Sequence, residues 1–395
     1  MAIDIWDNNI PVEKSSYIYD EHVEYYNLET FKLLPNKLTM LDLFCGAGGF
    51  AEGCSWANFQ SVFGIDHFKP AIQTWKKNHK NSIACLGDIT KINPDDIKQM
   101  LKEKGVNHIN LITGGVPCQG FSIANRKHND NDSRNFLFLE YMKFIKCFNP
   151  DYIILENVSG MRSTAGGQFE NEIKKCMENL GYNVSIKLVN SADYGVPQLR
   201  QRLLFVGVKT NCGLVSKYIF PEGQFIGKHR TVKDAISDLP SLKNNEEICK
   251  YNSAPQNDYE KLMRGLGCIK AIKKTTRLFN HKSPNHPKET IEKIKMTKPG
   301  MPMYSKFKQR IRLNMSAPSP TQLAGGIRPQ FQFGHPIQDR GLSIRERARI
   351  QSFPDSYEFV GGIVQERVQT GNAVPPLLIY NIVKPIAEDI TRSSK

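Results

Sequence analysis

Short apolar runs alternate with helical segments from Leu38 to Val208, and this alternation limits the fold more than any other feature of the sequence. Runs of strand length end in glycines or acids, and segments of helix length follow them. This order predicts an α/β fold with a doubly wound, mostly parallel sheet. Strands are expected at 38–44, 61–66, a short run ending at 87–89, 109–113, 151–156, 183–190 and 202–208, and helices at 50–56, 70–79, 94–104, around 136–144 and at 168–180.

The alternation covers only part of the chain and so divides it. The first segment, residues 1–36, is polar and aromatic without periodicity, and we expect it to lie on the surface of the fold. The third segment, residues 213–342, is rich in Lys, Asn and Pro, shows one clear short helix (232–239), and is the candidate second domain. A helical pattern resumes in the fourth segment, residues 343–395. The expected segments are 1–36, 37–212, 213–342 and 343–395.

Positive charge is concentrated in one block of the sequence. The whole chain has 53 Lys and Arg against 39 Asp and Glu, a formal net charge of +14. Between Lys209 and Arg310 there are 21 basic residues and 9 acidic ones, so this block carries +12 of the total. Such a block is typical of a surface that binds a polyanion, although a solvated lysine-rich surface would have the same composition.

Several classes of protein are disfavoured by composition. No run of eighteen apolar residues is present, so no membrane span is predicted. The first residues lack the basic and apolar segments of a secretory signal. Nine cysteines without a C-x-x-C pair fit neither a disulfide framework nor a zinc ribbon, and no metal site is predicted. A reducing cytoplasm is the expected location.

The stretch Gly114-Gly115-Val116-Pro117-Cys118-Gln119-Gly120-Phe121-Ser122 follows the strand expected at 109–113. In open α/β sheets, ligands bind at the carboxyl ends of the strands, where this stretch places Cys118. Pro117 fixes φ before the cysteine, and Gly120 allows a sharp turn after it. We interpret Cys118 as a nucleophile; the alternative is a small buried apolar residue.

A glycine-rich turn follows the first expected strand. Gly46-Ala47-Gly48-Gly49-Phe50-Ala51 fits G-x-G-x-x-A, and Asp66 lies twenty residues after Gly46. Glycines allow the close turn, and the acid can bind ribose hydroxyls, as an NAD site and an S-adenosylmethionine site both require. Phe44 and His67 can offer ring faces to adenine, and Asp88 can accept from its amino group. The turn alone is also compatible with no ligand.

Three further stretches carry polar groups. Glu156-Asn157-Val158 ends the next strand along the chain, so its side chains can reach the same crevice; a buried carboxyl there can stay protonated and donate to a ring nitrogen. Gln198-Leu199-Arg200-Gln201-Arg202 alternates, which predicts that its first, third and fifth residues share one face of a strand. Gly371-Asn372-Ala373-Val374-Pro375-Pro376 is expected to return the chain to the cofactor crevice. The structural alternatives are a helix cap, a surface strand and a plain turn.

In this order and spacing, these stretches resemble the motifs of the DNA (cytosine-5)-methyltransferases. The resemblance covers Leu38 to about Gly207 and Leu342 to about Ile390. Asp42 to Phe50 resembles the cofactor motif, and Pro117-Cys118-Gln119 the nucleophile motif. The segment 344–354 is similar to the element that supports the recognition domain. The sequence departs from many relatives at Asp66-His67, where they have Glu followed by an aromatic or aliphatic residue.

The resemblance implies S-adenosylmethionine as cofactor and methyl transfer to carbon 5 of a flipped cytosine, with Cys118 adding to carbon 6 as a thiolate. It implies that Glu156 donates to ring N3, that Arg202 binds the 2-oxo group, and that Arg200 and Asn157 hold the pocket. The implied cofactor contacts are Phe44, Gly46, Gly48, Asp66, His67, Asp88, Ile89, Asn372 and Val374. The implied DNA contacts are Gln119, Ser122, Arg126, Gln198 and Arg328. The polar loop 122–135 is expected to close over DNA.

The resemblance also implies a Rossmann-like catalytic domain, with 213–342 as the target-recognition domain and 343–395 as a supporting element. The implied partners are double-stranded DNA and a cognate restriction endonuclease, and we expect a prokaryotic, nucleoid-associated monomer. Three alternatives stay open: an NAD-dependent oxidoreductase, the tRNA-methylating branch of the same family, whose Cys-Phe-Thr signature is absent here, and a non-catalytic DNA-binding protein.

Overall fold

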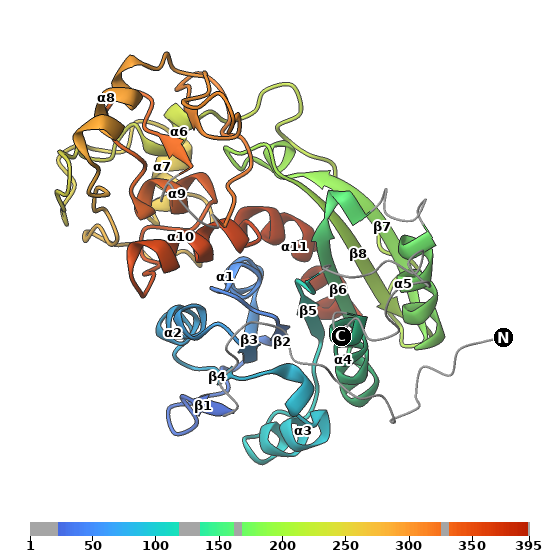
Figure 1. Cartoon of the computed structure of the whole chain (residues 1–395). Helices are drawn as coiled ribbons and strands as arrows, with labels where there is room; N and C mark the ends of the chain where they lie inside the picture. Colours follow the sequence, from blue (N-terminus) through green and yellow to red (C-terminus); the bar gives the residue numbers. More distant parts are fainter. Residues whose placement is uncertain (1–22, 118–134, 162–167, 325–331, 394–395) are drawn as a thin grey trace.

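A computed structural model describes residues 23–117, 135–161, 168–324 and 332–393. Its centre is an eight-stranded sheet with the strand order β1-β4-β3-β2-β5-β6-β8-β7 (Figure 1). Neighbouring strands from β4 to β6 are parallel, whereas β1 is antiparallel to β4, and β8 is antiparallel to both β6 and β7. The expectation of an α/β fold with a mostly parallel sheet is therefore confirmed. The strands are β1 Glu24–Tyr26, β2 Leu38–Leu43, β3 Phe59–Asp66, β4 Ile83–Leu86, β5 Leu111–Gly114, β6 Tyr152–Val158, β7 Tyr182–Asn190 and β8 Gln201–Lys209.

Helices cover both faces of the sheet, because successive strand residues point to opposite sides and both sides are apolar. In β6, Tyr152 and Ile154 pack into one core cluster, while Ile153 and Leu155 pack into the other. The helices α3 and α4 contribute to the second cluster and α1 to the first. The helices of this region are α1 Gly49–Trp56, α2 Lys69–Asn78, α3 Pro94–Glu103, α4 Asn135–Phe148 and α5 Gln168–Asn179.

The expected helices and strands of this region are all present, with boundaries shifted by a few residues. The described part of the N-terminal extension does more than lie on the surface. Its residues 24–26 pair with 84–86 of β4 and add an antiparallel strand to the edge of the sheet. A run of three residues carries too little periodicity to be recognised as a strand from the sequence.

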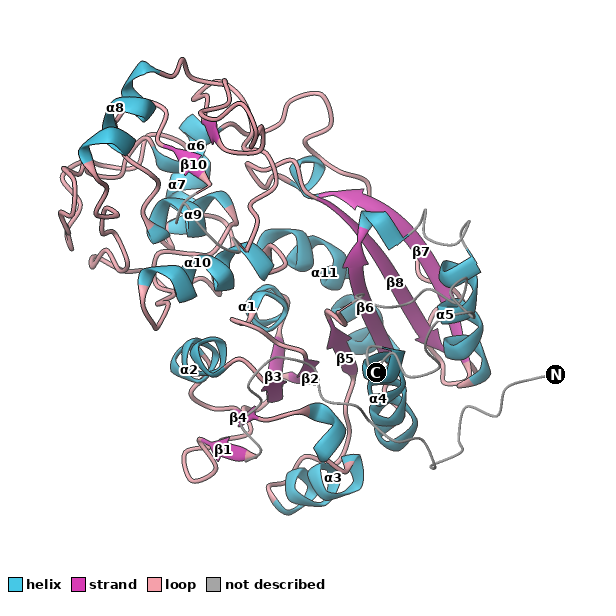
Figure 2. Cartoon of the chain, viewed as in Figure 1, coloured by secondary structure: helices cyan, strands magenta, loops and turns pink. Residues whose placement is uncertain are grey.

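The second region of the protein, from about residue 231 to residue 372, is rich in loops (Figure 2). Its short helix α6 Val232–Ile236 lies within the segment expected to be helical, and it starts with a capping box in which Thr231 and Asp234 satisfy each other. Two helices there were not predicted, α7 Asp258–Met263 and α8 Lys288–Met296. The other elements are β9 Ile311–Arg312, β10 Phe333–Gly334, α9 Ile344–Ile350 and α10 Ile363–Asn372.

The chain just after β8 still belongs to the sheet. Tyr218 is 4% exposed, its hydroxyl donates to Ile382 O at 2.7 Å, and its own carbonyl accepts from Ser185 of β7 at 2.6 Å. The loop-rich region therefore begins near Thr231 rather than at residue 213.

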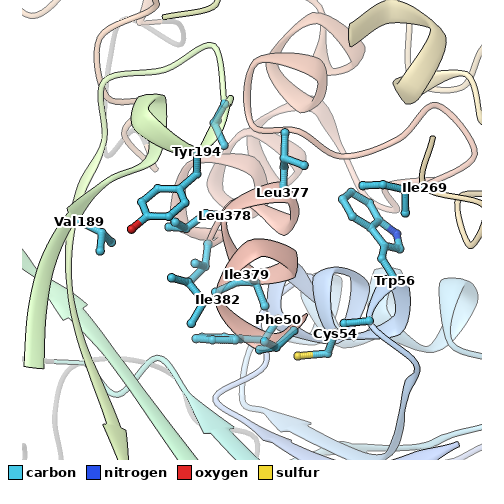
Figure 3. Close-up of a cluster of buried hydrophobic side chains, with 14 of the residues drawn as sticks. Phe50, Cys54, Trp56, Val189, Tyr194, Ile269, Leu377, Leu378, Ile379 and Ile382 are labelled. Carbon is cyan, nitrogen blue, oxygen red and sulfur yellow. The ribbon is translucent and has the colours of Figure 1, made fainter. Parts of the chain in front are cut away.

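The helix α11 Pro376–Ser393 joins the two regions. Figure 1 shows α11 between the group formed by α6–α10 and the strands. Its apolar side chains pack against α1 and against one face of the sheet, as Figure 3 shows for Leu378, Ile379 and Ile382 near Phe50 and Tyr194. No helix among the described residues is both long and apolar enough to cross a bilayer.

Candidate active site

The carboxyl ends of the parallel strands meet at one edge of the sheet. Leu43, the last residue of β2, lies opposite Ile65 of β3 and Gly114 of β5, and Asp66 lies opposite Leu86 of β4. From β2 the chain continues to β3 on one side of β2, and it later forms β5 on the other side. The carboxyl ends of β2 and β5 therefore flank a topological switch point. Such a point is where open α/β sheets bind ligands.

The glycine-rich turn after β2 is held by Asp66. One carboxylate oxygen accepts from the Gly46 N–H at 2.8 Å, and the other accepts from the Phe68 N–H at 2.8 Å. Phe44, Gly46 and Gly48 have positive φ angles of 56°, 51° and 91°. The acid predicted to bind ribose thus also fixes the turn.

The C-terminal segment 371–376 packs directly against this turn. A Cβ at Gly49 would lie 2.2 Å from Val374 O, and one at Gly53 would lie 2.4 Å from Pro376 O, so only glycine permits the contact. A Cβ at Gly48 would meet the Tyr357 hydroxyl at 2.5 Å. The segment predicted to return to the crevice thus contacts the glycine-rich turn after β2.

Buried titratable groups lie beneath the turn. Burial raises the pKa of Asp42 to about 7, although its carboxylate accepts from Thr113 at 3.0 Å and from Ala51 N at 3.3 Å. Burial lowers the pKa of His79 to about 3, and its ring lies 4.9 Å from that of Trp75. Burial thus shifts both groups towards their neutral forms.

The other predicted cofactor residues lie at the neighbouring strand ends. Gly87 N donates to Asp66 O at 3.1 Å, which places Asp88 one residue beyond that contact, and Asp88 Oδ1 accepts from Thr90 N at 3.0 Å. The His67 side chain is 55% exposed, whereas Ile89 is 4% exposed. Asn372 is exposed beyond the Gly371 carbonyl, on the segment that reaches the turn.

Glu156 and Arg202 form an ion pair at the ends of two adjacent strands. Glu156 is on β6 and Arg202 is near the start of β8, and Glu156 Oε1 lies 2.5 Å from Arg202 Nε. Both side chains are 12% exposed. A carboxylate and a guanidinium placed in this way can bind two adjacent polar atoms of one heterocycle.

The chain that leads to Cys118 passes beside this pair. A Cβ at Gly115 would lie 3.3 Å from Glu156 Oε2, and Asn157 Nδ2 donates to Val116 O at 3.2 Å. Asn157 is 4% exposed, so its amide holds the backbone two residues before Cys118. The structure therefore brings Glu156, Asn157 and Arg202 together with the described start of the nucleophile stretch.

Comparisons with known proteins agree with this geometry. The sequence profile of the C-5 cytosine-specific DNA methylase family matches residues 38–388. The chain belongs to this family. The Type II methyltransferase M.DdeI of Desulfomicrobium norvegicum is 33% identical, with 89% of this chain and 88% of the relative covered. The Type II methyltransferase M1.HphI of Haemophilus parahaemolyticus is 31% identical, with 88% and 86% covered.

A solved structure gives the same result. A protein from E. coli, described as a DNA modification methyltransferase encoded within a prophage, is 25% identical with a TM-score of 0.73, and the match covers 90% of this chain and 100% of that chain. The S. pombe Dnmt2 methyltransferase is 18% identical with a TM-score of 0.58 over 90% of this chain and 99% of its own, which shows the fold alone. This chain is thus a DNA cytosine-5-methylase by sequence and by fold.

One expectation about the methylase is wrong in its local geometry. The strand β8 begins at Gln201, so Gln198 and Arg200 precede it instead of sharing a strand face with Arg202. Both are 0% exposed, and the Gln198 amide is bound to Gln351 and Gln322 inside the protein. In this conformation Gln198 has no surface with which to contact DNA.

Arg200 is buried and binds backbone carbonyls of two other segments. It donates to Gln322 O at 3.0 Å and to Gly371 O at 2.9 Å, so it ties the start of β8 to the segment 371–376. Burial lowers its pKa to about 9, with the nearby Arg202 as a second cause. Its partners are neutral carbonyls, which explains why desolvation dominates.

Sequence reasoning missed the segment 319–324, which pairs with the residues before β8. Leu199 N donates to Ser319 O at 2.8 Å, and Thr321 Oγ1 donates to Leu199 O at 2.7 Å. A hollow of about 430 Å³ opens here. The segment is short and irregular, so no periodicity marks it. The residues lining the hollow are Ser159, Asn190, Leu199, Gln201, Arg202 and Thr321.

Some predicted site residues lie outside the described part of the methylase. They are Cys118, Gln119, Ser122, Arg126 and Arg328, together with most of the loop 122–135. Among the described residues, no three His, Cys, Asp or Glu side chains are grouped so that they could hold a metal ion.

Proposed function

We propose that this methylase transfers the methyl group of S-adenosylmethionine to carbon 5 of a cytosine turned out of duplex DNA, through a transient bond from Cys118 Sγ to carbon 6. One observation carries the proposal. The Glu156–Arg202 pair, joined at 2.5 Å, lies beside Gly115 on the chain that leads to Cys118. A nucleophile, an acid and a cation are thus assigned to one end of the sheet.

The chemistry of cytosine explains each of these groups. Carbon 5 is too electron-poor to attack a methyl sulfonium, and addition of a thiolate at carbon 6 makes it enamine-like. N3 and the 2-oxo group are neighbours on the ring, as Glu156 and Arg202 are neighbours in the site. Glu156 donates a proton to N3 as the thiolate adds, and Arg202 binds the 2-oxo group. After methyl transfer, a water molecule takes the carbon 5 proton, the electron pair of that bond restores the double bond between carbons 5 and 6 and expels the Cys118 thiolate, and N3 returns its proton to Glu156.

The turn after β2 fits the cofactor. No atom lies within 4 Å of a Cβ placed on Gly46, so there is room over the turn for a ligand. The Asp66 carboxylate can accept from ribose hydroxyls in addition to its two backbone N–H donors, and Asp88 at the next strand end can accept from an adenine amino group. Phe44 and His67 would flank the purine, with Val374 behind the turn. S-adenosylmethionine supplies an electrophilic methyl group on a sulfonium sulfur.

The remaining functional assignments rest on the family and on charge. The target-recognition domain, expected at 213–342, begins near Thr231 and extends to 342, residues 343–395 support it, and the basic residues of the +12 block within it contact DNA phosphates. Because two relatives are Type II methyltransferases, we also infer a cognate restriction endonuclease that cuts the same DNA site. The enzyme acts as a monomer in a prokaryotic cytoplasm.

The first experiment is to methylate genomic DNA with the protein and S-adenosylmethionine and to sequence the modified cytosines. Duplexes that contain the site with 5-fluorocytosine at the target then trap the covalent intermediate, because fluorine cannot be lost as a proton. We expect wild type to form an adduct that survives denaturation. Cys118→Ala should form none, yet bind the duplex with affinity within a few-fold of wild type.

Glu156→Gln in the same assay should trap at least about 100-fold more slowly with unchanged cofactor binding, since general acids contribute about 10²–10⁴ in rate. Methyl transfer by Cys118→Ala would overturn the proposal. Labelled methyl groups that enter tRNA but not duplex DNA would assign the protein to the tRNA-methylating branch instead.

A further inference from the structure

The longest part of the chain without an acidic residue lies in the second region. Between Lys293 and Gln338 there are 46 residues with eight Lys and Arg and no Asp or Glu. Two of the basic residues, Arg310 and Arg312, are 8% and 7% exposed and serve the fold. The lysines of this stretch are exposed, and two of them, Lys306 and Lys308, lie more than ten positions in the sequence from any acidic residue.

Within this stretch, an irregular hairpin follows the end of α8. Met303 N donates to Arg310 O at 2.8 Å, Arg312 N donates to Met301 O at 3.1 Å, and Gly300 N donates to Arg312 O at 2.7 Å. These bonds pair 300–303 with 310–312. The tip, Tyr304-Ser305-Lys306-Phe307-Lys308-Gln309, projects from this paired base.

The tip is built around a buried arginine. The Arg310 guanidinium lies 4.5 Å from the centre of the Phe307 ring and 5.7 Å from that of Tyr304. Lys293 Nζ lies 5.0 Å from the centre of the Tyr304 ring. Stacking of this kind fixes the rings, while Phe307 stays 43% exposed between two exposed lysines. An ordered, exposed aromatic ring between cations is a typical nucleic-acid contact.

The hairpin is connected to the active site by a short run of chain. Twelve residues separate Phe307 from Ser319, which pairs with Gln198 just before β8. A chain of this length spans at most about 40 Å, little more than one turn of duplex DNA. The hairpin tip therefore lies within about one turn of duplex DNA of Ser319, beside the strand that carries Arg202.

We propose that the hairpin tip 304–309 is a DNA-contacting element of this methylase, in which Lys306 and Lys308 bind phosphates and Phe307 contacts a base beside the target cytosine. This inference rests on the proposed function. Charge complementarity selects duplex DNA as the partner, and the exposed ring adds an apolar surface of the kind that contacts the methyl group of thymine.

The test uses the full-length protein and the DNA site found by genomic methylation. Lys306→Glu/Lys308→Glu should weaken binding at least tenfold and lower the slope of log affinity against log salt by about two, because each phosphate contact contributes about 0.9. The matched control is Lys102→Glu/Lys175→Glu, two exposed lysines on α3 and α5 that lie outside the +12 block, which should stay within a few-fold of wild type.

Phe307→Ala should relax the sequence preference at one position of the methylated site. Its control is Ile219→Ala, because Ile219 is 82% exposed on the sheet region. Phe307→Leu keeps a side chain over Arg310, and equal thermal midpoints of both Phe307 variants exclude misfolding as the cause. If either tip variant behaves like its control while wild type methylates DNA, the inference is overturned. If wild type methylates no DNA, the proposed function fails first.

Discussion

At the scale of single residues, the support of the cofactor turn depends on Asp42, which has no exposed surface. Its carboxylate accepts from Thr113 on the neighbouring strand and from Ala51 in α1, so one side chain joins β2, β5 and the first helix. These hydrogen bonds favour the ionised form, but burial outweighs them and raises the pKa to about 7. The residue holds the site together at an electrostatic cost that depends on pH.

The pKa of Asp42 predicts a pH-dependent effect of Asp42→Asn. Because the folded pKa, about 7, exceeds the ordinary value of 3.8, the folded state binds the proton more tightly. Stability from this group is therefore complete below about pH 4 and is lost as pH rises to about 7. The loss is at most about 4 kcal/mol, from about 1.36 kcal/mol for each pH unit.

We expect the free energy of unfolding of Asp42→Asn, relative to wild type, to increase between pH 4 and pH 7 and to be constant above that range. Chemical denaturation at several pH values measures it. A difference that does not vary with pH would show that Asp42 titrates alike in the folded and unfolded states.

At the scale of elements, the contact between α1 and the segment before α11 positions the cofactor turn. Gly49 and Gly53 lie one turn apart on α1, so both glycines face the same side of the helix. Because neither glycine has a side chain, the backbone at Val374 and Pro376 approaches α1 directly. At these two glycines the chain meets α1 through backbone contact, beside the side-chain packing of α11 against α1.

Gly49→Ala should therefore destabilise the methylase by at least about 2 kcal/mol, since the added methyl would overlap a backbone carbonyl that cannot rotate away. We also expect weaker cofactor binding, because Val374 must move from the turn. Gly160→Ala is the control: a Cβ there meets nothing within 4 Å, and the backbone has no positive φ. Denaturant unfolding and cofactor titration measure both effects. Equal stability of the two variants would contradict this account.

Buried arginines of α9 connect several separate segments of the second region. Arg349 binds Asp355 at 2.6 Å and Asp238 at 2.9 Å, while Arg345 donates to Phe279 O at 2.9 Å. Arg347 donates to Leu323 O at 3.1 Å and so reaches the segment beside the active site. Loss of one partner would leave a buried charge without its counter-charge, which is costly. The folded protein therefore requires these segments to keep their positions around α9.

At the scale of the whole molecule, α11 is the common core of both regions. Its side chains lie in the same apolar cluster as residues of the sheet and of α6 and α7. Five of them have no exposed surface: Leu378, Ile379, Ile382, Val383 and Ile386.

A chain that ends at Pro375 should not fold. Truncation of one buried Leu or Ile to Ala costs about 2–5 kcal/mol, and a whole domain is stable by only about 5–15 kcal/mol, so loss of five such side chains exceeds the total. Circular dichroism and solubility measure the result, and a chain that ends at Ser393 is the control. A soluble, cooperatively folded truncated chain would show that the sheet is stable without α11.

The sequence by itself determined the α/β class, the order of the strands along the chain and the family. Periodicity, glycine turns and capping residues act between neighbours in sequence, as at 38–51 and at Ser343 with Glu346, where a capping box starts α9. The site residues at strand ends followed from the same rule, because parallel strands place their carboxyl ends at one edge.

Tertiary structure alone decided which side chains meet and which are buried. The alternation at 198–202 looked like one strand face, yet Gln198 is enclosed by residues more than 100 positions away, and only Arg202 reaches Glu156. Gly49 was recognisable as part of a turn, but its need for glycine depends on Val374. The burial and partners of a side chain depend on atoms that are distant in sequence, and a local pattern holds no record of them.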